Sequence, residues 1–165
     1  MSGMLRIWGS VAAAALVAGS AFPQDRTAEL RTQFAQESNP VRKAKLMPRL
    51  GEAEFREIAG AVAAGHLADA LATLERYRAE VQACQEGLDA MRIDAEKHPA
   101  GFKQLQISLR ESLRRLDHLL EGLTADEQAP FLAVRKDLDQ TNRHLFHELF
   151  PRQPASDTPA EKPAR

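Results

Sequence analysis

The chain has little of several features that define common protein classes. Its single cysteine, Cys84, excludes an intramolecular disulfide framework. Its 22 lysines and arginines are balanced by 23 aspartates and glutamates, which excludes the strongly basic footprint of a nucleic-acid-binding protein. Its longest apolar run, from Ile7 to Ala18, is shorter than the ~20 residues that a membrane-spanning helix needs. The 165 residues, of which 44% are hydrophobic, suit one globular domain.

Residues 1–21 predict an export signal. Arg6 precedes the apolar run and small residues end the segment at Ala21, which is the charge, hydrophobic core and small-residue order of a secretory signal peptide. Cleavage after Ala21 leaves a periplasmic or extracellular chain without stable membrane insertion. The alternative is an uncleaved N-terminal anchor. In an oxidising compartment Cys84 is either buried or paired between chains, and its helical surroundings favour burial.

The body of the chain predicts helices. Leucine and alanine together contribute 48 residues, whereas valine, isoleucine and threonine contribute 16, and no clean alternation of apolar and polar residues indicates a strand. Apolar spacing and capping residues divide the chain into five segments. They cover residues 26–36, 40–65, 67–96, 99–121 and 125–150. Pro48 makes the second segment either one kinked helix or two helices.

Amphipathic helices joined by short turns bury their apolar stripes against one another. We therefore predict an all-α, up-and-down antiparallel bundle of about four long helices plus a short N-terminal helix, within residues 22–150. Leu74 and Leu116 are expected in its core. The tail, residues 151–165, has four prolines and no large apolar side chain, which predicts disorder.

Residues 51–79 resemble one tetratricopeptide-type helical hairpin, with Gly65 at the turn and Ala70 and Leu71 on the second helix. The resemblance implies two helices that approach closely at small residues. It occurs once, whereas solenoids stack about three repeats, so it indicates a single hairpin.

The stretch from Leu123 to Gln128, LTADEQ, is similar to the LTxxQ signature of exported helical stress chaperones and metal-resistance proteins. Its glutamine comes one residue late, and the stretch occurs once. The same residues have the spacing of a capping box, in which Thr124 and Glu127 satisfy each other's backbone donors at a helix start.

Catalytic patterns are missing from the sequence. No Gly-x-Ser-x-Gly turn and no glycine-rich phosphate loop occurs. The acids Glu52 and Glu54 fall on different helix faces, so we expect both to be solvated. Glu52, Glu54 and Glu57 balance the charge of a nearby basic run. The alternative is that this run contacts anionic lipid or an acidic partner. This run comprises Arg42, Lys43, Lys45 and Arg49. We expect neither enzymatic activity nor a cofactor.

His144, His147 and Glu148 form the best candidate metal site. Residues three and four apart share a helix face, so His144 is able to join either neighbour in holding a divalent ion. Two ligands make a weak site, and Asp117 and His118 on the preceding helix would have to complete it. The alternative is a solvated helix end whose histidines complement the helix dipole.

The sequence as a whole favours an exported, non-enzymatic bundle that acts through a protein surface. Two mechanisms remain open within this class: an adaptor or complex subunit that uses a groove between helices, and a holdase that binds unfolded proteins. The competing class is a periplasmic metal-binding or metal-stress protein. We expect protein partners, with a homo-oligomer as one possibility, and no nucleic acid.

Overall fold

The structure is a computed structural model that describes residues 23–151. The predicted signal peptide at residues 1–21 lies outside the described residues, as does the predicted tail beyond Pro151. Five helices make up the described part of the chain. They are α1 (Pro23–Gln36), α2 (Pro40–Ala63), α3 (Leu67–Asp89), α4 (Phe102–Leu120) and α5 (Ala125–Leu149). Within this part, no helix combines the length and the apolar character that a membrane crossing requires.

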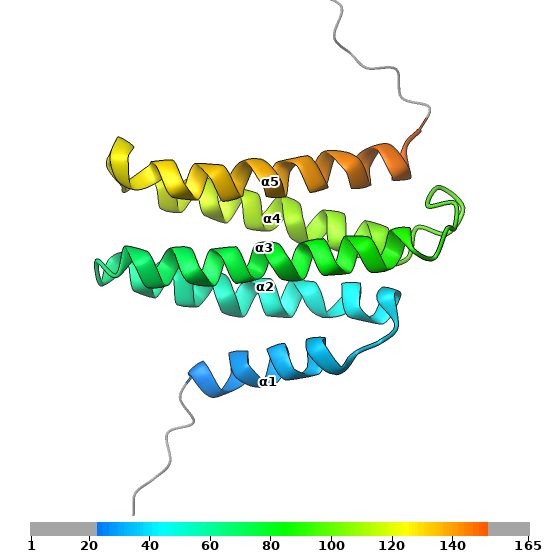
Figure 1. Cartoon of the computed structure of the whole chain (residues 1–165), viewed down its shortest axis with the longest axis horizontal. Coiled ribbons are helices and arrows are strands. Elements are labelled where there is room, and N and C mark those ends of the chain that lie inside the picture. The colour runs from blue at the N-terminus through cyan, green and yellow to red at the C-terminus, as the bar shows by residue number, and fades with distance from the viewer. Residues whose placement is uncertain (1–22, 152–165) are drawn as a thin grey trace, which may run out of the picture.

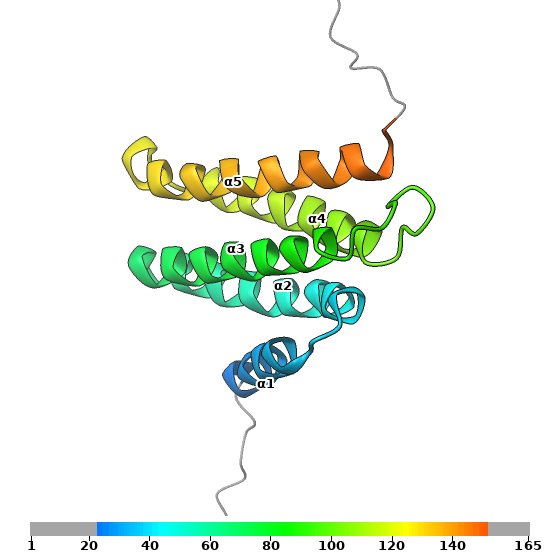
Figure 2. The same ribbon diagram turned by 45° about the vertical axis from the view of Figure 1, so that its right-hand side comes forward.

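The four long helices lie alongside one another and alternate in direction, and α1 crosses the outside of α2 (Figures 1 and 2). The most extensive helix–helix contacts are α2 with α3 and α2 with α4, followed by α4 with α5 and α3 with α5. This arrangement confirms the predicted bundle of four long helices preceded by a short one. The segments that connect the four long helices lie at the two opposite ends of the bundle. The longest of these connections, from α3 to α4, is at one end.

Leucine is the commonest residue of the core, and the core leucines come from α2 to α5. Leu74 and Leu116 are completely buried, which confirms both as core residues. Tyr77, which the sequence pattern places beside the apolar stripe, is also completely buried, and its hydroxyl lies 2.7 Å from the Ser112 hydroxyl. Cys84 is buried too, as expected, and its burial raises the pKa of the thiol to about 12.

The start of α2 follows its sequence signals. The Asn39 side chain accepts a hydrogen bond from the backbone N–H of Arg42 at 3.0 Å, and Pro40 occupies the first turn. The helix continues past Pro48 to Ala63 as one element, which resolves the choice between one helix and two. Pro48 itself is exposed, whereas Ala44, whose carbonyl loses its helical donor at the proline, is completely buried.

The prediction that the third helix reaches Glu96 is wrong, because α3 ends at Asp89. Residues 90–101 form a loop in which Arg92 has a positive φ of 52°. The Asp94 carboxylate accepts hydrogen bonds from the backbone N–H groups of Glu96 and Lys97, at 3.0 and 3.2 Å. Such local bonds compete with the helix for the same backbone donors.

The fourth helix also begins later than expected, at Phe102 and not at Pro99. Gly101 precedes it with a φ of 90°, and its N–H donates to Gln104 Oε1 at 2.9 Å. A Cβ at position 101 would lie 2.7 Å from a Leu88 methyl group. Glycine is therefore required here by both the backbone angle and the space, and the sequence pattern did not show it.

The turn between α4 and α5 is closed by the LTADEQ stretch. The Glu127 carboxylate accepts from the backbone N–H of Thr124 at 2.9 Å, as the capping-box spacing predicts, and it also accepts from the Thr124 hydroxyl at 2.7 Å. The Gln128 amide donates to the carbonyls of Leu120 and Leu123, at 2.8 and 2.9 Å. Gln128 thus satisfies acceptors at the end of α4, which is a local structural role.

Candidate functional site

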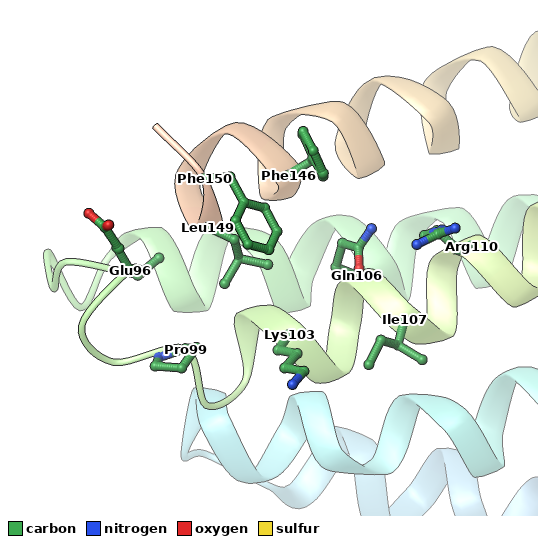
Figure 3. A pocket seen from close by; sticks show the side chains of 10 residues that line it. Glu96, Pro99, Lys103, Gln106, Ile107, Arg110, Phe146, Leu149 and Phe150 are labelled. Carbon is green, nitrogen blue, oxygen red and sulfur yellow. The ribbon is translucent and has the colours of Figure 1, made fainter. Parts of the chain in front are cut away.

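A groove lies at the end of the bundle where the 90–101 loop, the first half of α4 and the last turn of α5 meet (Figure 3). We call it the terminal groove. Its volume is about 750 Å³, within the ~300–1,000 Å³ range of ligand-binding sites. Its apolar lining comes from all three elements and includes Pro99, Ile107, Phe146, Leu149 and Phe150.

Several apolar side chains of the terminal groove are open to solvent. Ile107 is 47% exposed, Phe146 37% and Phe150 50%, and the two phenylalanine rings lie 5.1 Å apart between centroids. These three residues are the majority of the five exposed large hydrophobic residues in the described part of the chain. Exposed apolar side chains that cluster at one place indicate a binding surface, whereas single exposed apolar side chains scattered over a surface do not.

Helical spacing explains how these side chains come together. Ile107 and Arg110 share a face of α4 with Lys103, whereas Phe146 and Phe150 are one turn apart at the end of α5. A hydrogen bond of 3.3 Å from the Gln106 amide to Asn142 Oδ1 links the two helices beside the groove. Leu149 is buried and fixes the last turn of α5 against the core, so the groove has firm walls.

The rim of the terminal groove is positive on the α4 side. Among the described residues, neither Lys103 nor Arg110 has an ion-pair partner, although both line the groove. Three other arginines of α4 and α5 are paired with aspartate or glutamate side chains, whereas Arg114 has no such partner among the described residues. These pairs are Arg115 with Glu111, Arg135 with Asp117, and Arg143 with Asp139. Glu96 lies across from the cations, on the loop.

The predicted metal residues lie on α5 near the terminal groove. His144 faces α3, where its Nε2 is 3.3 Å from Asp89 Oδ2, and His147 and Glu148 are exposed. In the residues that the structure describes, no three His, Cys, Asp or Glu side chains are grouped so that they could hold a metal ion. Within the described residues, His144, His147 and Glu148 are therefore not part of a three-ligand group, either with one another or with Asp89.

Asp117 and His118, which could complete the site only if the helix faces aligned, lie elsewhere on α4. Asp117 accepts a 3.0 Å hydrogen bond from Arg135, and His118 lies 3.3 Å from Glu121. Because α4 and α5 are antiparallel, the partner of Asp117 is nine residues before His144, or about 14 Å along α5.

A second feature, which the sequence analysis missed, is a buried acidic pair beneath α1. Glu54 was expected to be solvated but is completely buried. Arg31 from α1 donates to Glu54 Oε1 at 2.8 Å and to Glu57 Oε2 at 2.9 Å. The signal was present in the sequence, because Glu54 lies four residues after Leu50 and four before Ile58, on the buried stripe of α2.

Glu80 from α3 faces Glu54. Burial and the Glu54 carboxylate raise the pKa of Glu80 to about 8, and burial also raises the pKa of Glu54. Among the described residues, the Oε2 atom of each carboxyl group lacks a hydrogen-bond donor. A proton on Glu80, shared with Glu54, supplies one. A pKa near neutrality suits acid–base catalysis, but a completely buried Glu54 cannot touch a substrate, so the pair fits a structural role.

Comparison of the chain with protein-family models, with curated proteins and with solved structures finds no match.

Proposed function

We propose that the protein is an exported, non-enzymatic interaction module that holds a partner protein in the terminal groove. The observation that carries this proposal is the clustering of half-exposed Ile107, Phe146 and Phe150 on the wall of one groove. Covering such side chains contributes about 25 cal/mol per Å² of apolar surface removed from water. A bundle of long helices supplies the rigid support that such a surface needs.

The composition of the groove argues against catalysis. None of the residues that line it in the described structure is a serine, cysteine or histidine, so the groove lacks a hydroxyl or thiol nucleophile of these types and a histidine base. Its ionisable side chains are Glu96, Lys103 and Arg110. These charged groups, beside the apolar side chains, suit recognition of a partner surface that carries both charged and apolar residues.

An adaptor or complex subunit fits the groove better than a holdase does. A holdase binds many unfolded segments through broad or adaptable apolar surfaces. Here the apolar side chains are confined to a site whose walls are fixed by buried Leu149 and by the Gln106–Asn142 hydrogen bond. A site of fixed shape and size favours one defined partner.

Site-directed photo-crosslinking in living cells tests the proposal. A benzophenone amino acid replaces Ile107, and in the control it replaces Leu132, which is 45% exposed on α5 and does not line the groove. We expect one dominant protein adduct from position 107 and none from position 132. A smear of many adducts from position 107 favours the holdase. Equal adducts from both positions, or none from either, contradict an interaction through this groove.

Export is tested in the same cells. If residues 1–21 are a signal peptide, the protein recovered from the envelope or the medium begins at Phe22 or within a residue or two of it. Mass spectrometry of the N-terminal peptide gives this boundary. An intact N-terminus in the membrane fraction supports the uncleaved anchor.

A further inference from the structure

The unpaired cations of the terminal groove indicate the chemistry of its partner. Lys103 and Arg110 lie seven residues apart on one face of α4, with Ile107 between them. At 1.5 Å per residue this row of cation, apolar residue and cation is about 10 Å long, or two turns of a helix. Phe146 and Phe150 line the groove from the end of α5 (Figure 3).

We propose that the terminal groove binds an acidic amphipathic helical segment of a partner protein. This inference rests on the proposed function and specifies the class of partner. A helix lays apolar side chains at positions i, i+3, i+4 and i+7 along such a groove. Those side chains would cover Ile107, Phe146 and Phe150, and flanking glutamates or aspartates would meet Lys103 and Arg110. The two basic side chains would then be ion-paired, as the other arginines of α4 and α5 named above already are.

Two other occupants fit the charges less well. A second copy of this chain in a two-fold arrangement would place the same patch against itself, so Lys103 and Arg110 would face their own counterparts. The chain's own residues 152–165 contain Arg152, Lys162 and Arg165 against two acids. That segment is therefore net basic, and its three prolines oppose a helix.

The exposure of the groove favours a protein segment over a small amphiphilic anion. Small-molecule sites bury about 70–90% of the ligand, within walls that are themselves largely covered. In the terminal groove, Phe150 is half exposed and Ile107 nearly so. An occupant must cover these side chains from outside, which a helix of several turns does.

The test uses three labelled peptides of about 16 residues with the same leucine pattern and with glutamate, glutamine or lysine at the polar positions. Fluorescence anisotropy at low ionic strength measures their binding to the purified protein. We expect the glutamate peptide to bind about tenfold more tightly than the glutamine peptide, and the lysine peptide to bind least. This preference should weaken as salt is added.

Two double variants locate the charge preference. Lys103→Glu with Arg110→Glu should abolish it or reverse it in favour of the lysine peptide. Lys45→Glu with Arg49→Glu makes the same charge change on exposed residues of α2 and should leave the preference intact. Loss of the preference in the α2 variant alone would overturn the inference, because the acidic peptide would then bind the basic run of α2.

An Ile107→Asp variant separates the inference from the proposed function. If all three peptides bind equally and Ile107→Asp abolishes binding, the groove docks apolar segments of any charge, and only the acidic partner is refuted. If Ile107→Asp leaves peptide binding unchanged, the terminal groove is not the site and both proposals fail. Direct binding of dodecanoate in calorimetry, without any binding of the glutamate peptide, refutes the helical partner and assigns the groove to small anions.

Discussion

Glu80 should make the stability of the bundle fall as the pH rises from about 5 to about 8. In the folded protein the pKa of Glu80 is about 8, against an ordinary value of 4.5. Between these values the folded state keeps a proton that the unfolded chain releases, so the free energy of unfolding decreases with pH. Arg31 and Arg76 oppose the shift but do not outweigh burial and the Glu54 carboxylate. The raised pKa of Glu54 acts in the same direction.

The size of the effect follows from the distance between the two pKa values. At about 1.4 kcal/mol per pH unit, a rise from 4.5 to about 8 sets an upper limit of about 5 kcal/mol. Glu80 is only partly buried, so solvent screens its interaction with Glu54, and we expect a loss of about 2 kcal/mol. Glu80→Gln replaces the protonated acid with a neutral amide of the same shape. This variant should keep nearly the same stability across the range.

Urea unfolding followed by far-UV circular dichroism, at intervals between about pH 5 and about pH 9, measures the effect. Glu75→Gln is the control, because Glu75 is exposed on the same helix, and this variant should retain the slope of the parent protein. A parent stability that stays level or rises over this range would refute the shared proton. So would a Glu80→Gln variant that retains the full slope.

Three further predictions concern the core, the glycines and the α4–α5 turn, and thermal and urea unfolding measure all of them. Leu116→Ala should destabilise the bundle by about 2–5 kcal/mol, because Leu116 is completely buried. Ile107→Ala in the groove should change the stability by about 0.5 kcal/mol or less. Equal effects of the two substitutions would refute the assignment of Leu116 to the core. Gly101→Ala should destabilise the bundle by at least about 1 kcal/mol, because residue 101 has a positive φ and the added Cβ would clash with the Leu88 methyl group. Gly60→Ala lies on open helix surface and should stabilise the bundle by about 0.5–1 kcal/mol. The same sign for both glycines would contradict this reasoning. Gln128→Ala should destabilise by about 1 kcal/mol by removing two hydrogen bonds to the end of α4, and an unchanged midpoint would show that water replaces them.

The helical architecture was predictable because it depends on repeated features. Each long helix has an apolar stripe of several residues, and an error at one position leaves the period unchanged. Local caps set several boundaries as well, including Asn39 at the start of α2 and Thr124 before α5. At the turn between α2 and α3, Gly65 has a φ of 75° and Ala70 is buried.

The 90–101 loop was not predictable in the same way, because single contacts determine it. Residues up to Glu96 have acceptable helix propensity, and only the Asp94 side chain and the left-handed Arg92 end α3 early. Gly101 reads in sequence as an ordinary glycine before a helix. The lack of space for a Cβ at Gly101 depends on the approach of Leu88 and Val41, which precede it by 13 and 60 residues along the chain.

Glu54 shows a different limit of sequence analysis. Its place on the apolar stripe of α2 was visible, but a carboxylate there is stable only with a partner, and Arg31 is 23 residues away on another helix. Breaking such a pair leaves an uncompensated buried charge. The Arg31 bond therefore explains both the burial of Glu54 and the docking of α1 across α2.

The terminal groove was indicated in the sequence by large apolar residues that lie outside the buried apolar stripes of α4 and α5. Ile107 lies between Leu105 and Leu109, both of which are completely buried, and Phe146 and Phe150 each follow a buried leucine of α5. The buried leucines already supply the contacts that α4 and α5 make with the core. The core therefore does not need the exposed apolar side chains of Ile107, Phe146 and Phe150. All three lie at the same end of the bundle, beside two cations without ion-pair partners in the described residues. Exposed apolar groups that do not serve the core, placed beside unpaired charges, are what a docking site for an acidic helix requires.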